Sequence, residues 1–259
     1  MASDPMMLAG GLVEVAVSGR GPPVWVFHSL LADAGSCVPL AAALAERFTV
    51  MLPHLPGFAG SAVAGPELAA VADRMAAAMA ETATPAAIVA NGYGSFVALT
   101  VALRHPHLVS RMVLAGTGAA FSEPGRAAFR GMAAAARAKG LEAIADTAMR
   151  RLFAPAFQAA NPALLAERRE RFLATDEAVF TGACDALTAL DIRSAVPGLA
   201  MPVMVMVGAE DEATPPAMAR ELAGLVPSAV FVELEGLAHV PQMQDTRRFM
   251  GEIEAFLAA

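Results

Sequence analysis

The strongest constraint on the fold of this chain is an alternation of short apolar runs with alanine-rich stretches that carry the charge. Most of these runs are apolar throughout, as strands buried on both faces of a parallel sheet must be. The expected strands are Val24–Phe27, Phe48–Leu52, Ala87–Ala90, Met112–Ala115, Val203–Val207 and Val230–Leu234. The expected helices are Leu40–Arg47, Leu68–Glu81, Phe96–Arg104, Pro216–Leu225 and Thr246–Leu257. This alternation predicts an α/β fold with a mostly parallel, doubly wound sheet and right-handed crossovers.

The alternation stops between Phe121 and Pro197. This region holds three segments of helical composition, Gly125–Phe153, Pro162–Ala174 and Glu177–Ala189, and no convincing strand. An all-helical insertion between two strands is the expected form of a lid over the carboxyl ends of the strands, where open parallel sheets bind ligands. We therefore predict a core domain of residues 1–120 and 198–259 and a helical cap of residues 121–197.

Charge and hydropathy limit the kinds of partner and the cellular compartment that we expect. With 18 basic and 25 acidic residues the net charge is −7, and no basic stretch occurs, which argues against nucleic acid or an anionic membrane as a partner. The partner that we expect is a small-molecule substrate. Residues 1–5 lack the basic-then-apolar pattern of a signal peptide. The uncharged stretch Thr82–Leu103 contains Pro85 and Asn91-Gly92, so it predicts a strand, a turn and a helix instead of a membrane span. We expect a soluble cytoplasmic protein.

No cofactor or metal site is indicated. No G-x-G-x-x-G opens a strand–helix unit with an acidic residue about 20 positions further on, so a nucleotide cofactor is not expected. The five histidines show no metal-ligand spacing. Cys37 and Cys184 lie far apart and in no CxxC arrangement, so we expect free thiols, with Cys37 filling the core.

Four loops follow predicted strands directly and contain polar side chains. They are His28–Leu31, Asn91–Ser95, Gly208–Asp211 and Gly236–His239. Because the carboxyl ends of neighbouring parallel strands lie at one edge of a sheet, residues of these loops are expected to meet there. Asp211 alone is as well explained by a turn or helix cap and His239 alone by a structural loop histidine, but together, after successive strands, they are expected to face each other.

From Val24 to the C-terminal helix, the chain resembles the α/β-hydrolase superfamily. The resemblance depends on the ordered loops above, the helical lid and Leu55-Pro-Gly-Phe-Ala-Gly-Ser61. His28-Ser29-Leu30 and the lid segments Ala143–Asp146, Phe153–Phe157 and Leu173–Asp176 are most similar to the 3-oxoadipate enol-lactonase branch. The resemblance implies an α/β-hydrolase fold and hydrolysis of an ester or lactone.

The chain departs from the superfamily at the nucleophile elbow. This G-x-S-x-G motif presents a serine on a strained strand-to-helix turn. Registering the strand and helix aligns Ala90-Asn91-Gly92-Tyr93-Gly94 with the motif, so the nucleophile position is Gly92, which has no side chain. Ser95 falls in the first turn of the helix, where a helix-capping or packing serine is the ordinary interpretation, and we do not take it as a replacement. Gly92 is either natural or a deliberate replacement of a serine.

Without the serine, the catalytic site that the resemblance implies still has an acid–base pair and two N–H donors. Asp211 is expected to orient His239 and to stabilise its protonated form. The resemblance implies that the backbone N–H groups of Leu30 and Tyr93 form an oxyanion hole. The space left by the serine side chain at Gly92 is expected to hold a water that His239 activates as general base.

Three alternative functions are compatible with these residues. The first is hydrolysis of a small ester, lactone or activated carbonyl compound by the His239–Asp211 pair. The lactone resemblance implies an acidic substrate, with Arg150, Arg151 or Arg193 as candidate contacts near the lid. The second is non-hydrolytic base catalysis by a lyase, an isomerase or a cofactor-free oxygenase. The third is binding of a small ligand without catalysis.

The other four histidines are expected to lie outside this machinery. His28 is interpreted as a structural loop histidine, and His105 and His107 as surface groups at the end of a helix. His54 stands where the superfamily often has an acidic residue, and a role for it in the pocket stays open.

Overall fold

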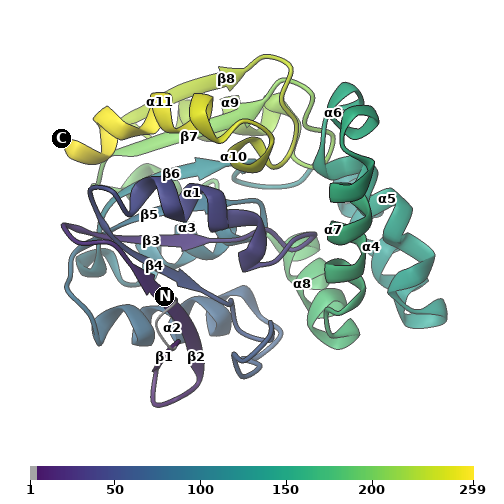
Figure 1. Cartoon of the computed structure of the whole chain (residues 1–259), viewed down its shortest axis with the longest axis horizontal. Coiled ribbons are helices and arrows are strands. Elements are labelled where there is room, and N and C mark those ends of the chain that lie inside the picture. The colour runs from purple at the N-terminus through teal and green to yellow at the C-terminus, as the bar shows by residue number, and fades with distance from the viewer. Residues whose placement is uncertain (1–4) are drawn as a thin grey trace.

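The computed structural model describes residues 5–259, so part of the N-terminal segment that lacks a signal-peptide pattern lies outside the described residues. Figure 1 shows one twisted sheet of eight strands in the order β1-β2-β4-β3-β5-β6-β7-β8. The strands are β1 (Met6–Leu8), β2 (Val13–Ser18), β3 (Pro23–Phe27), β4 (Thr49–Pro53), β5 (Ala86–Asn91), β6 (Val109–Ala115), β7 (Val203–Gly208) and β8 (Ala229–Leu234). From β4 to β8 all neighbours are parallel, which confirms the predicted fold class.

The two strands at the antiparallel edge, β1 and β2, were not predicted. β2 pairs antiparallel with both β1 and β4. Its sequence Val-Glu-Val-Ala-Val-Ser alternates, with Val13 and Val15 buried and Ala16 and Ser18 exposed. A search for wholly apolar runs misses a strand that buries only one face.

Helices cover both faces of the sheet. On one face lie α1 (Val38–Leu44) and α11 (Thr246–Ala258), and on the other lie α2 (Leu68–Ala80), α3 (Tyr93–Arg104) and α9 (Pro216–Leu225). Alternate residues of β3 enter the two cores, because Val24 and Val26 pack with α1 and α11, whereas Trp25 and Phe27 pack with α2 and α3. All five helices correspond to predicted ones, with ends shifted by up to a few residues.

The segment between β6 and β7 is helical, as predicted. It comprises α4 (Glu123–Lys139), α5 (Ala145–Leu152), α6 (Pro155–Ala160), α7 (Pro162–Leu173) and α8 (Glu177–Ala189), which we call the helical insert. In Figure 1 it lies at one end of the sheet, against the loops that follow the parallel strands. Short α6 was not predicted. The division into a core domain and a cap domain stays a prediction.

The long uncharged stretch divides as expected into a strand and a helix. Residues Ala86–Asn91 form β5, and Tyr93–Arg104 form α3. Across residues 5–259, no helix combines the length and the apolar character that crossing a membrane requires. The cytoplasmic location stays a prediction.

Candidate active site

Gly92 lies at the sharp turn between β5 and α3, where the registered motif places it. Its backbone angles are φ 54° and ψ −123°, in a region that glycine occupies at little cost and that costs other residues about 1–3 kcal/mol. Gly94 permits close packing of α3 on β3, because a Cβ there would lie 2.7 Å from the backbone of Phe27 and His28. The sharp strand-to-helix turn that the registered motif predicts is therefore present, with no side chain at Gly92.

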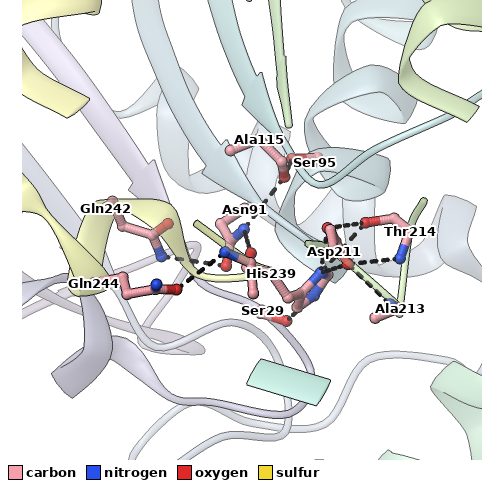
Figure 2. Close-up of polar contacts among 11 residues, drawn as sticks. Ser29, Asn91, Ser95, Ala115, Asp211, Ala213, Thr214, His239, Gln242 and Gln244 are labelled. Atoms are coloured by element: carbon pink, nitrogen blue, oxygen red, sulfur yellow. Dashed lines mark hydrogen bonds and ion pairs between the residues drawn. The ribbon is translucent and has the colours of Figure 1, made fainter. Parts of the chain in front are cut away.

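Asp211 and His239 meet at the carboxyl ends of β7 and β8. His239 Nδ1 lies 3.0 Å from Oδ2 of Asp211 and 3.2 Å from Oδ1, and both side chains are buried (Figure 2). The Asp211 carboxylate also accepts hydrogen bonds from the N–H groups of Ala213 and Thr214, at 2.8 and 2.9 Å, and from the Thr214 hydroxyl at 2.7 Å. This acceptor holds the proton of His239 on Nδ1, which leaves the lone pair of Nε2 directed toward Gly92.

A second set of polar side chains makes hydrogen bonds to the main chain around His239 (Figure 2). The Asn91 side-chain amide donates to the His239 carbonyl at 2.7 Å, and Gln242 donates to Asn91 Oδ1 at 3.2 Å. Gln244, also from α10 (Pro241–Gln244), accepts the Ala238 N–H at 3.0 Å. Sequence reasoning missed the two glutamines and Thr214, and it placed Asn91 in the turn without giving its side chain a role. The available signal was a pair of glutamines three and five residues after the histidine.

The Ser29 side chain occupies the space beside Gly92. Its Oγ lies 3.2 Å from His239 Nε2. A Cβ built on Gly92 would lie 2.4 Å from Ser29 Oγ, 2.9 Å from Ser29 Cβ and 2.7 Å from His239 Nε2. The water expected in this space stays a prediction. A serine from the loop after β3 lies there, a contact that the sequence pattern did not reveal.

Leu30 and Tyr93 border the same space. Tyr93 is the first residue of α3, and N–H groups in the first turn of a helix have no intrahelical acceptor. The Leu30 N–H donates to no acceptor within the described part of the chain. Both residues line a small cavity together with Ser29, Gly92 and His239. Two free N–H donors beside a base can stabilise an oxyanion, the role that the resemblance implies for them.

This inner cavity of about 30 Å³ lies next to a larger pocket of about 560 Å³. The two share Phe121, Phe129, Arg151 and Ala213. The inner cavity is mostly apolar, whereas the outer pocket also holds charged side chains: Arg193, Glu212 and Glu221.

The three candidate arginines have different surroundings. Arg151 lines both cavities, and its guanidinium contacts Met132 Sδ at 3.9 Å and pairs with no carboxylate among residues 5–259. Arg193 lines only the outer pocket and is bound to Asp191. Arg150 is exposed and lies at neither cavity.

His28 and Ser95 both make structural hydrogen bonds. His28 Nδ1 donates to the Ser29 carbonyl at 3.0 Å, and its Nε2 accepts the Leu55 N–H at 3.1 Å. Burial lowers the pKa of His28 to about 4, so its ring is neutral at neutral pH. The Ser95 hydroxyl donates to the Ala115 carbonyl at 3.0 Å and is not bonded to His239. These contacts agree with the structural interpretation of both residues.

The remaining sequence candidates lie away from the paired groups. His54 lines neither cavity, and its Nδ1 has no hydrogen-bond partner within residues 5–259. His105 binds Asp73 at 2.8 Å near the surface. Cys37 and Cys184 are free and buried, and burial raises their pKa values to about 11 and about 12, which leaves both thiols protonated.

Comparison with known proteins agrees with this architecture. Residues 22–246 match the family model for the alpha/beta hydrolase fold. A pimeloyl-[acyl-carrier protein] methyl ester esterase of Aromatoleum aromaticum is 30% identical over 244 residues, which cover 86% of this chain and 88% of that protein. A 3-oxoadipate enol-lactonase of Acinetobacter baylyi is 27% identical over 165 residues, covering 63% of this chain and 60% of that protein.

Solved structures extend the similarity to the whole chain. The enol-lactonase from Burkholderia xenovorans LB400 superposes with a TM-score of 0.89 at 27% identity, covering 98% of this chain and 100% of that one. The predicted resemblance to enol-lactonases is therefore confirmed, and esterases are similar as well. Because the family model spans most of its length and the fold agrees throughout, this chain belongs to the α/β-hydrolase family.

Proposed function

We propose that the protein hydrolyses small carboxylic esters or lactones, with His239 as its general base. The observation that carries this proposal is the 3.0 Å contact between His239 Nδ1 and Asp211, with Nε2 facing a cavity that Leu30 and Tyr93 also line. Similarity to proteins named as esterases and enol-lactonases supports hydrolysis over non-hydrolytic base catalysis or simple binding.

Each group has one role in this mechanism. His239 Nε2 accepts the proton of the attacking oxygen, and Asp211 stabilises the imidazolium that forms. The N–H groups of Leu30 and Tyr93 donate to the negative oxygen of the tetrahedral intermediate. His239 then returns the proton to the departing alkoxide. Gly92 stands at the nucleophile position and supplies only backbone.

We further propose that the preferred substrate carries a carboxylate that binds Arg151. Three observations support this: Arg151 lines both the inner cavity and the outer pocket, it is half-buried, and no carboxylate of the described chain pairs with it. Glu212 and Glu221 line only the outer pocket, so the inner end is the part suited to an anion. A guanidinium binds a carboxylate through two parallel hydrogen bonds.

The test is hydrolysis of p-nitrophenyl acetate and butyrate by the wild type and by His239→Ala. We expect the variant to lose about 10³-fold or more in kcat/KM, because the base is removed. His107→Ala, which changes an exposed histidine, is the matched control and keeps its activity. Equal activity in all three proteins would contradict the proposal. Hydrolysis incorporates solvent ¹⁸O into the acid product, and its absence would indicate one of the non-hydrolytic reactions.

A further inference from the structure

We infer that the Ser29 hydroxyl is the attacking oxygen, so that the nucleophile comes from the loop after β3 instead of from the β5–α3 turn. The inference rests on the proposed ester or lactone hydrolysis and adds a catalytic residue to it. The resulting triad is Ser29, His239 and Asp211, joined by contacts of 3.2 Å and 3.0 Å.

The position of Ser29 Oγ is the first reason. A serine at position 92 would carry its oxygen about 1.4 Å from its Cβ, and Ser29 Oγ lies 2.4 Å from where that Cβ would stand. The Ser29 hydroxyl therefore lies close to the place where an elbow serine would present its own. It also makes the hydrogen bond to His239 Nε2 that such a serine would make.

The hydrogen-bond pattern is the second reason. Asp211 fixes the proton of His239 on Nδ1, so Nε2 is an acceptor and the Ser29 hydroxyl is the donor in this contact. Within residues 5–259, the Ser29 hydroxyl makes no other hydrogen bond that would hold its proton away from His239. Its proton already points at the atom that must receive it.

The oxyanion donors are the third reason. In this fold, one donor is the N–H of the residue after the nucleophile and the other comes from the loop after β3. With Ser29 as nucleophile, Leu30 becomes the residue after the nucleophile and Tyr93 the donor from the other loop. The same two N–H groups therefore form the oxyanion hole with either nucleophile.

Attack by Ser29 proceeds as an ordinary acyl transfer. The Ser29 oxygen bonds to the ester carbonyl carbon while its proton moves to His239 Nε2, and the carbonyl electron pair becomes the oxyanion. On collapse the carbon–alkoxy bond breaks, and the alkoxide takes the proton from His239, which leaves acyl-Ser29. A water then gives a proton to His239 Nε2 as its oxygen bonds to the acyl carbon. On collapse the bond from that carbon to Ser29 Oγ breaks and Ser29 Oγ takes the proton from His239, which releases the acid and restores the hydroxyl.

Direct attack by water is the competing mechanism. The inner cavity of about 30 Å³ has room for about two waters, enough for the water that deacylates Ser29. The two mechanisms differ in one observable, since only attack by Ser29 passes through a covalent enzyme intermediate.

Covalent labelling of the wild type tests this directly. An alkyl fluorophosphonate should add once per chain and abolish hydrolysis. Trypsin places Ser29 in the peptide of residues 21–47 and Ser95 in the peptide of residues 75–104, so mass spectrometry assigns the adduct, and fragmentation separates Ser29 from Ser36. Adduct on Ser29 is the expected result. Full hydrolytic activity after prolonged exposure, with neither peptide modified, would overturn the inference.

Kinetics of Ser29→Ala separates the inference from the proposed function. We expect a loss of about 10³-fold or more in kcat/KM and no burst of p-nitrophenol, with an unchanged melting temperature as the check on folding. Ser95→Ala is the matched control and keeps the burst. Activity that survives Ser29→Ala but not His239→Ala would overturn the Ser29 assignment and leave the hydrolase proposal standing. A wild type without turnover would contradict the hydrolase proposal itself.

Discussion

The Ser29 hydroxyl and the His239 imidazole, 210 residues apart in sequence, lie 3.2 Å apart in the structure. Ser29 follows β3 near the middle of the sheet, and His239 follows β8 at its edge. Their contact fills the position that Gly92 leaves without a side chain. The turn at Gly92, which has no side chain of its own, thus still has a hydroxyl beside the histidine.

A serine introduced at Gly92 should conflict with Ser29. Gly92→Ser places a Cβ 2.4–2.9 Å from the Ser29 side chain at positive φ, so we expect a loss of about 1–3 kcal/mol in the free energy of unfolding. Adding Ser29→Gly removes the steric part and should restore some stability, with the fluorophosphonate adduct moving to residues 75–104. Urea unfolding and peptide mapping measure both effects.

Gly131→Ser is the control for that substitution, because Gly131 is exposed in α4 with nothing within 4 Å of an added Cβ. The Gly131→Ser substitution should leave the free energy of unfolding unchanged or raise it slightly. A Gly92→Ser protein as stable as the wild type would show that the Ser29 side chain does not constrain this position.

Asp211→Asn should remove most of the activity while keeping the fold. An amide NH₂ at this position donates to His239 Nδ1 and stabilises the wrong tautomer, in which Nε2 carries the proton and cannot act as base. We expect kcat to fall about 10⁴-fold. Asp185→Asn, which breaks an exposed ion pair with Arg137, is the control and should retain activity. A small effect of Asp211→Asn on ester hydrolysis would argue against His239 as the base.

Arg151→Gln should lower the hydrolysis of negatively charged esters much more than that of neutral esters. Hydrogen bonds to a charged group contribute about 1.5–3 kcal/mol, so kcat/KM for a p-nitrophenyl hemisuccinate should fall about 10- to 100-fold, while p-nitrophenyl butyrate should be little affected. Arg150→Gln changes the neighbouring exposed arginine, which lies at neither cavity, and should affect neither ester. Equal losses on both esters would show that Arg151 supports the pocket without binding a carboxylate.

His28 should make the fold sensitive to mild acid. Its pKa is about 4 in the folded chain and 6.5 in the unfolded chain, so between these values the unfolded chain binds more protons and stability falls as the pH falls. The total loss by pH 4 is about 3 kcal/mol for this group. His28→Gln removes this contribution, and its stability should depend less on pH between 6.5 and 4 in urea unfolding. His107→Gln, at an exposed position, should follow the wild type.

The sequence pattern alone was enough to predict the fold class and which residues follow each strand. The six predicted strands, most of them apolar throughout, correspond to β3–β8, and the helical insert lies where these runs stop. Asp211 and His239 could be paired in advance because parallel strands end at one edge of the sheet. The alternating β2 was missed, since half-buried strands at an antiparallel edge lack the wholly apolar pattern.

Only the tertiary structure decided what stands beside Gly92. Strand periodicity determines where a loop begins, but the direction of one serine side chain depends on how two loops distant in sequence pack together. That packing directs Ser29 toward His239 Nε2, while Ser95, only three residues from Gly92, donates to Ala115 instead. Sequence reasoning set Ser95 aside correctly but gave Ser29 no role, because hydrogen-bond geometry is set by distances in space that local sequence patterns do not contain.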